Sequence, residues 1–195
     1  MQRSIVLASS SPYRRELLSR LGLDFKALTP DFTETIDQGV APDLQVKHLA
    51  LGKARSLVNT CPDALIIGSD QVFCDASGRI LGKPGDMPGA QRQLERMAGK
   101  KHHFYTGVAL VNSAKGHTQV ASVVSTVVLR DLSSAQIRYY LERERPFDCA
   151  GSFKVEGLGI ALMEQVTGSD YTALIGLPLI ALTNMLQKAG IDPLS

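Results

Sequence analysis

The sequence lacks the features that mark a disulfide-stapled, zinc-binding or nucleic-acid-coating protein. Its three cysteines, Cys61, Cys74 and Cys149, are widely spaced and form no C-x-x-C pair, so we expect reduced thiols and no zinc site. The 21 Lys and Arg residues nearly balance the 19 Asp and Glu residues, which excludes a strongly basic coat and an acidic tail. No nucleic-acid partner is therefore expected.

Long apolar runs and internal repeats are also missing. Nowhere do about 18 apolar residues follow one another, as a membrane helix needs, and the first residues, MQRSIVLASSSPYRR, lack the apolar length of a signal sequence. We therefore expect a cytoplasmic protein with no membrane partner. No low-complexity linker marks a boundary, so residues 1–195 are expected to form a single domain.

The sequence does contain an alternation of short apolar runs and helix-like segments. Ser11 and Pro12 are suited to the start of a helix, and Gly22 to its end. Strands are expected at 4–8, 64–67, 103–111, 119–129 and 160–163, a hairpin at 72–81, and helices at 12–21, 42–59, 88–98, 134–144 and 178–189. Because some neighbours are joined by turns and others by helices, the fold class is α/β with a mixed sheet.

A serine loop, Ser9 to Ser11, lies between the first strand and the first helix. Unpaired N–H groups at a helix N-terminus, with hydroxyls beside them, can cradle an anion. Arg14 and Arg15 lie in the first helical turn, where the helix dipole disfavours cations, and an anionic ligand would remove that conflict. Alternatively, the serines only cap the helix and the arginines face water.

Two lysines and several carboxylates are candidates for a site. Lys53 lies on the core-facing stripe of its expected helix, where a lysine either snorkels to solvent or meets an anion. Lys83 follows the expected hairpin in the loop GKPG, and Asp70 follows an apolar strand at the sheet edge where open α/β folds bind ligands. Asp70 could instead cap a turn. Together with carboxylates such as Glu34, the set would suit a metal-bound polyphosphate.

Eight segments, taken in order from about residue 5 to residue 180, resemble the Maf family of nucleoside triphosphate pyrophosphatases. They are LASSSPYRRELL, the Glu34 region, Lys53-Ala54, IIGSDQV, LGKP, YTG at Tyr105 to Gly107, CAGSFKVEGLG and SDYTALIGLPL. The resemblance implies an elongated mixed sheet flanked by helices, as in inosine triphosphatases, with two lobes and a central cleft. It also implies a homodimer.

The resemblance further implies hydrolysis of a nucleoside triphosphate between its α and β phosphates, with a divalent cation, Mg²⁺ or Mn²⁺. It places the acidic general base on Asp70 and phosphate handling on Ser9, Arg14, Lys53 and Lys83. Asp70 and Glu34 become the expected metal ligands.

Within the family, three positions separate substrate branches, and here they are Tyr13, Gln71 and Glu156. An aromatic residue, Gln and Glu resemble the branch that prefers 7-methyl-GTP, although tryptophan is the aromatic expected at position 13. A methylated guanine is positively charged, so an aromatic face and a carboxylate would both attract it. The alternatives are a dTTP and UTP pyrophosphatase, a nucleotide-binding regulator of cell division without essential turnover, and a phosphosugar enzyme.

Overall fold

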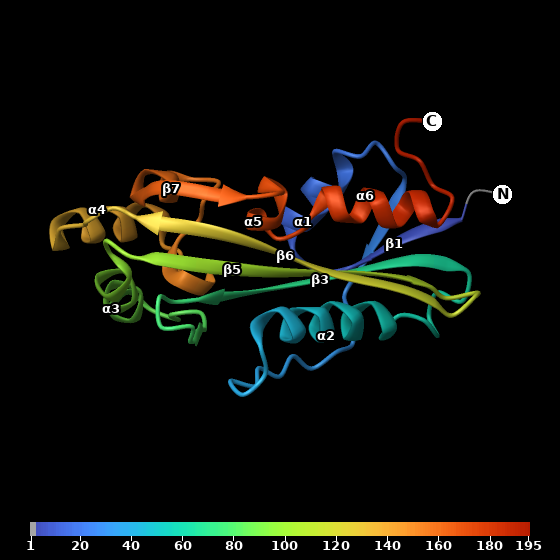
Figure 1. The fold of residues 1–195 in the computed structure, drawn as a ribbon, viewed down its shortest axis with the longest axis horizontal. Helices are drawn as coiled ribbons and strands as arrows, with labels where there is room; N and C mark the ends of the chain where they lie inside the picture. The colour runs from blue at the N-terminus through green and yellow to red at the C-terminus, as the bar shows by residue number, and fades with distance from the viewer. Residues whose placement is uncertain (1–2) are drawn as a thin grey trace. The chain divides into compact units, whose positions relative to one another are not determined.

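The computed structural model describes residues 3–195 and contains one seven-stranded mixed sheet with helices packed on it (Figure 1). The strand order is β2-β1-β3-β5-β6-β7, and β4 pairs with β3. The strands are β1 (Ser4–Ala8), β2 (Phe25–Leu28), β3 (Ala64–Cys74), β4 (Ile80–Leu81), β5 (Lys101–Asn112), β6 (His117–Leu129) and β7 (Met163–Gly168). This confirms the expected α/β class with a mixed sheet.

Six α-helices and two 3₁₀ helices join these strands in the described chain. They are α1 (Pro12–Ser19), α2 (Pro42–Arg55), α3 (Met87–Met97), α4 (Ser134–Glu144), η1 (Ala150–Ser152), η2 (Leu158–Leu162), α5 (Tyr171–Ile175) and α6 (Leu179–Lys188). Within residues 3–195, every helix is too short or too polar to cross a bilayer.

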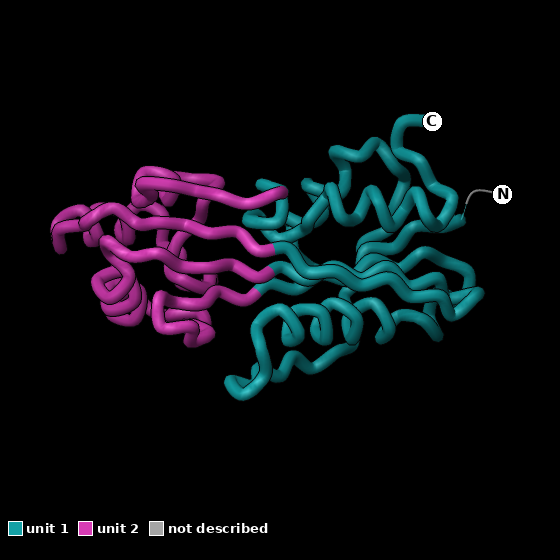
Figure 2. Tube along the Cα trace, viewed as in Figure 1, with its two compact units in different colours: residues 1–71, 106–123, 170–195 teal, residues 72–105, 124–169 magenta. Residues whose placement is uncertain are grey.

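The chain divides into two compact units, coloured separately in Figure 2. Unit 1 contains Met1–Gln71, Thr106–Val123 and Asp170–Ser195, and unit 2 contains Val72–Tyr105 and Val124–Ser169. The two units agree with the two expected lobes. The central cleft and the single domain over 1–195 stay predictions.

In unit 1, the parallel pairing of β1 with β3 ends before β3 does. β1 pairs in parallel with β2 on one side and with β3 on the other, and the last pair with β3 is Ala8 with Gly68. The chain leaves the sheet after Ala8, whereas β3 continues to Cys74. Residues 69–71 of β3 therefore extend beyond the carboxyl end of β1, the position at which open α/β sheets bind ligands.

Alternating side chains give unit 1 two apolar layers. Ile5 and Leu7 of β1 pack toward α1 and α6, whereas Val6 and Ala8 pack toward Ala50 and Ala54 of α2. This is the two-residue period of a strand buried on both faces. Helices consequently cover both faces of this part of the sheet (Figure 1).

Three of the expected elements differ from the structure by more than two residues. The strand expected at 64–67 extends to Cys74, and the helix expected at 42–59 ends at Arg55. The strand expected at 160–163 is wrong, because residues 158–162 form a 3₁₀ helix and strand β7 begins only at Met163. Asp70 therefore lies within a strand and not after its end.

Candidate functional site

The serine loop after β1 builds the N-terminus of α1 from its own hydroxyl groups. Oγ of Ser11 accepts a hydrogen bond from the backbone N–H of Arg14, and Oγ of buried Ser9 accepts one from the N–H of Ser11. Pro12 begins the helix, as expected. Ser11 therefore caps the helix and Ser9 holds the loop before it, both as acceptors, while each hydroxyl hydrogen can still be donated to an anion.

The side chain of Arg14, in the first turn of α1, contacts Gly176 and Asp70. Its Nε donates to the carbonyl oxygen of Gly176 at 2.9 Å, and its Nη2 lies 3.9 Å from Oδ1 of Asp70. Burial lowers the pKa of Arg14, while the Asp70 and Glu34 carboxylates raise it. The guanidinium stays charged in proteins, so it brings a fixed positive charge to the carboxylates. Arg15, by contrast, is exposed.

Lys53 meets anions instead of snorkelling to solvent. Its side chain is 6% exposed, and Nζ lies 2.5 Å from Oδ1 of Asp70 and 2.7 Å from Oε1 of Glu34. α2 brings the lysine from one side, β3 brings Asp70, and the segment between β2 and α2 brings Glu34. A charge this deeply buried needs partners, and here it has two.

Gln71, the next residue of β3, uses its amide nitrogen to hold α5. Nε2 donates to Oγ1 of Thr106 at 2.9 Å and to the carbonyl oxygens of Ala173 and Leu174 at 2.9 and 3.1 Å. Since carbonyls only accept, these contacts fix which end of the amide faces α5. Oε1 takes part in none of these contacts, so it can accept a hydrogen bond from a ligand.

Ser69 and Gly176 are two residues of this region that the sequence analysis did not single out. Ser69 is fully buried, and its Oγ lies 2.7 Å from the carbonyl oxygen of Gly107 and 2.9 Å from that of Gly176. The Gly176 carbonyl thus contacts both Ser69 and the Nε of Arg14. Ser69 directly precedes Asp70 in IIGSDQV, and this adjacency to a candidate catalytic carboxylate was the available signal.

The structure therefore gathers one group of the expected site residues in unit 1. Arg14, Lys53, Asp70 and Glu34 are linked by ionic contacts. Tyr13, in the turn of α1 that carries Arg14, is 39% exposed. Lys83 and Glu156 are exposed residues of unit 2, and their membership of the same site stays a prediction.

The carboxylates of the cluster fit a hard divalent cation. Glu34 and Asp70 both approach one ammonium nitrogen, so their oxygens already face a common positive charge. No group of three or more His, Cys, Asp or Glu residues that could hold a metal occurs within residues 3–195. Two carboxylates completed by phosphate oxygens are a typical Mg²⁺ arrangement, so these residues suit a cation that arrives with a polyphosphate.

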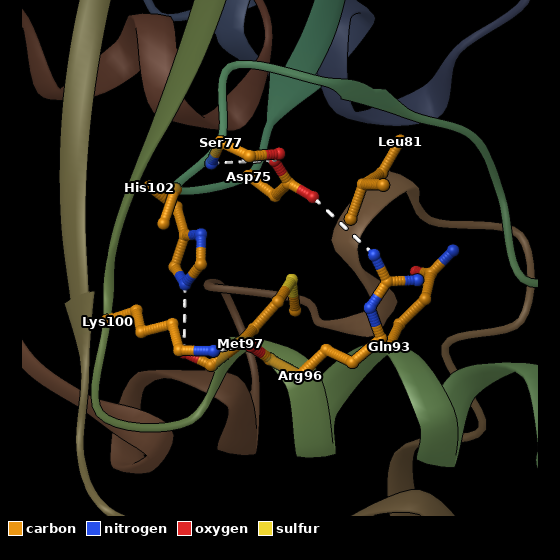
Figure 3. A pocket seen from close by; sticks show the side chains of 9 residues that line it. Asp75, Ser77, Leu81, Gln93, Arg96, Met97, Lys100 and His102 are labelled. Atoms are coloured by element: carbon orange, nitrogen blue, oxygen red, sulfur yellow. Dashed lines mark hydrogen bonds and ion pairs between the residues drawn. The ribbon is translucent and has the colours of Figure 1, made fainter.

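Unit 2 contains a separate pocket of about 360 Å³ between the β3–β4 turn, α3 and the start of β5 (Figure 3). Asp75 accepts from Ser77, and Nε2 of fully buried His102 bonds to the carbonyl oxygen of Met97. Nδ1 of His102 is buried without a hydrogen-bond partner in the described chain. Burial lowers the pKa of His102. None of the residues expected at the site lines this pocket.

Comparisons with known proteins agree with this geometry. The family model described as Maf-like protein matches residues 4–189. A 7-methyl-GTP pyrophosphatase of Syntrophotalea carbinolica is 58% identical, over 96% of this chain and 95% of its own length. A protein of the same name from Pseudomonas aeruginosa is 49% identical, over 96% and 97%. In fold, a HAM1 protein from Coxiella burnetii is similar with a TM-score of 0.51 at 14% identity, over 96% of this chain and 100% of its own. The chain belongs to the Maf family.

Proposed function

We propose that this Maf-family chain is a nucleoside triphosphate pyrophosphatase that hydrolyses 7-methyl-GTP to 7-methyl-GMP and pyrophosphate. The observation that carries the proposal is buried Lys53, held between buried Asp70 and the more exposed Glu34, with Arg14 beside it. The cluster occurs in a chain 58% identical to a relative named 7-methyl-GTP pyrophosphatase. Its cations and carboxylates are the chemistry that a metal-bound triphosphate requires.

In this proposal, the basic residues hold the phosphates. Lys53 supplies a buried positive charge and Arg14 a partly buried one, Ser9 supplies a hydroxyl, and Lys83 adds an ammonium group. Fixed charges in a site that excludes water stabilise the charge that develops on a transferring phosphoryl group without reorganising. Positioning and electrostatics therefore account for most of the expected rate enhancement.

Asp70 acts as the general base in this proposal. Within residues 3–195 both of its ionic contacts use Oδ1, to Lys53 and to Arg14. Oδ2 can therefore take a proton from the attacking water. Glu34 and Asp70 would hold a divalent cation, Mg²⁺ or Mn²⁺, which supplies neutralisation of phosphate charge when it is bound.

Three residues carry the proposed preference for a methylated guanine. Tyr13 offers an exposed aromatic ring, which attracts a cationic base. Gln71 offers Oε1 as a hydrogen-bond acceptor, since its nitrogen is engaged with α5. Glu156 offers a negative charge complementary to the methylated ring. We further propose that the enzyme acts in the cytoplasm, as a homodimer, without nucleic-acid or membrane partners.

A panel of triphosphates tests the reaction and the branch together. 7-Methyl-GTP, GTP, dTTP and UTP are supplied with Mg²⁺ or Mn²⁺, and pyrophosphate and orthophosphate are measured separately. We expect pyrophosphate and the monophosphate from 7-methyl-GTP at the highest kcat/KM. Orthophosphate as the first product, a preference for dTTP and UTP, or binding without turnover would each contradict the proposal.

Replacing the proposed base tests the mechanism. Asp70→Asn is expected to lower kcat at least about a hundredfold, the scale of a lost general base, while nucleotide binding stays measurable by calorimetry. Asp75→Asn is the control, because Asp75 binds Ser77 and Arg79 within unit 2. Full activity of Asp70→Asn would remove Asp70 from this role.

A further inference from the structure

Gly52 lies inside α2, directly before Lys53, where a glycine is unfavourable for the helix. Its missing side chain makes room for the ring of Phe32. A Cβ placed on Gly52 would lie less than 3.0 Å from three carbons of that ring. An alanine at position 52 could therefore be accommodated only if the ring moved away from the helix.

The segment that carries Phe32 also carries Glu34, and it contains no helix or strand between residues 29 and 41. Three contacts join it to α2. The Phe32 ring packs on Gly52 and lies 6.3 Å, centroid to centroid, from His48. Glu34 contacts Lys53, and buried Gln45 binds the carbonyl oxygen of Thr35 at 2.8 Å and the N–H of Asp37 at 3.1 Å.

The ion pair alone is a weak anchor for this segment. The Glu34 side chain is 53% exposed, and ion pairs that reach solvent contribute little because water competes for the charges. The neighbouring residues from Thr33 to Ala41 are all exposed. Two packed contacts therefore flank this carboxylate and hold it near Lys53: the ring of Phe32 on Gly52, two residues before Glu34, and the hydrogen bonds of Gln45 to the residues after it.

We propose that Phe32 and Gly52 are positioning residues: the ring of Phe32, seated on Gly52, holds the Glu34 carboxylate at the Lys53–Asp70 pair. The role of Glu34 at that pair rests on the proposed function, whereas its placement does not. Glycine at position 52 therefore makes α2 less stable, but it leaves the space that the Phe32 ring occupies.

Cleavage by an endoprotease specific for glutamate tests the placement without any reaction being measured. Glu34 is the one glutamate between residues 29 and 41, so a cut after it reports release of this segment. Gly52→Ala and Phe32→Ala are each expected to raise the rate of this cut about tenfold, because local opening controls proteolysis, and Phe32→Leu by less. Lys47→Ala, elsewhere on α2, is the control and should leave the rate unchanged.

The double variant Gly52→Ala/Phe32→Ala separates this placement from a general effect on the helix. Without the ring there is nothing for the new methyl group to displace, so the double variant should be cut no faster than Phe32→Ala. Alanine favours the helix, so Gly52→Ala should remain folded by circular dichroism. An unchanged rate in Gly52→Ala, or rates that multiply in the double variant, would overturn the proposal.

Kinetics test whether the placement acts through Glu34. Gly52→Ala should lower kcat toward the value of Glu34→Gln, and it should cause no further loss when added to Glu34→Gln. A further loss in that background, or an unchanged kcat despite faster cleavage, would contradict a positioning role. If the wild type hydrolyses no triphosphate, the proposed function fails, while the cleavage rates still decide whether Phe32 and Gly52 place Glu34.

Discussion

At the scale of single residues, two buried serines differ in a way that burial does not reveal. Oγ of Ser69 contacts two backbone carbonyl oxygens, whereas Oγ of Ser125 is buried without a hydrogen-bond partner in the described chain. Ser69→Ala is expected to reduce the free energy of unfolding by about 1–3 kcal/mol, because the two carbonyls lose the one buried hydroxyl donor that they share. Ser125→Ala should leave it unchanged or higher. Urea unfolding of both variants measures the difference, and equal losses would contradict it.

His102 gives the protein a stability that depends on pH. Burial lowers its pKa in the folded state below the ordinary value of 6.5, so below about pH 6.5 the unfolded state binds the proton and the folded state does not. Stability contributed by neutral His102 is present above that pH and decreases as the pH falls toward the folded-state pKa. His102→Gln should therefore show a shallower loss of unfolding free energy between pH 7 and pH 5. An identical slope in both proteins would contradict this.

The sequence predicts single residues well where periodicity restricts them. The helical stripe placed Lys53 toward the core and left two outcomes open, and the structure shows that it meets Asp70 and Glu34. The contacts of Gln71 to α5 could not be predicted from the sequence, because they join residues about 100 positions apart. No local pattern encodes such a pairing.

At the scale of elements, α2 lies unusually close to the sheet at two glycines. A Cβ on Gly68 of β3 would approach Ala50 O and Ala54 N within 3.0 Å, and one on Gly107 of β5 would approach the Val46 carbonyl as closely. Backbone contacts cannot yield as a flexible side chain can, so Gly107→Ala is expected to cost about 1–3 kcal/mol of unfolding free energy. Gly82→Ala, which has open space around it, serves as the control in the same thermal melts. Similar midpoints for the two variants would mean that α2 can shift freely.

Elements with strong apolar patterns are the ones that sequence reasoning finds. The buried strand β1 and the capped helix α1 were predicted to within a few residues. β2 was missed because it has only four residues, none of them fully buried, and β7 was misplaced at 160–163 because five of its six residues are exposed. An edge strand does not need the alternation that identifies a buried one.

At the scale of the whole molecule, the proposed cation should matter for turnover and hardly for folding. Only two protein carboxylates, Glu34 and Asp70, are assigned to it, and substrate phosphates would complete its coordination. Excess EDTA is therefore expected to abolish pyrophosphate release and to leave the thermal midpoint of the ligand-free protein within about 1 °C, since weak binding adds little stability. Calorimetry with and without EDTA measures this. A fall of about 5 °C or more would instead indicate a tightly held structural ion.

The fold class follows from the sequence because the alternation of strands and helices is a whole-chain pattern. The division into two units is not visible in the same way. The boundaries after Gln71, Tyr105, Val123 and Ser169 coincide with no change in composition. Three of the four fall within single strands, β3, β5 and β6, where a continuous apolar pattern conceals them.

The chain passes between the two units four times, and this restricts which recombination events can replace one unit. Unit 1 is assembled from three separate stretches of sequence and unit 2 from the two between them, as the alternating colours along the tube in Figure 2 show. No single breakpoint releases either unit intact, so recombination cannot exchange one unit for a foreign counterpart by joining two gene fragments. New substrate preferences are therefore expected to arise through point substitutions around a retained framework and not through domain shuffling.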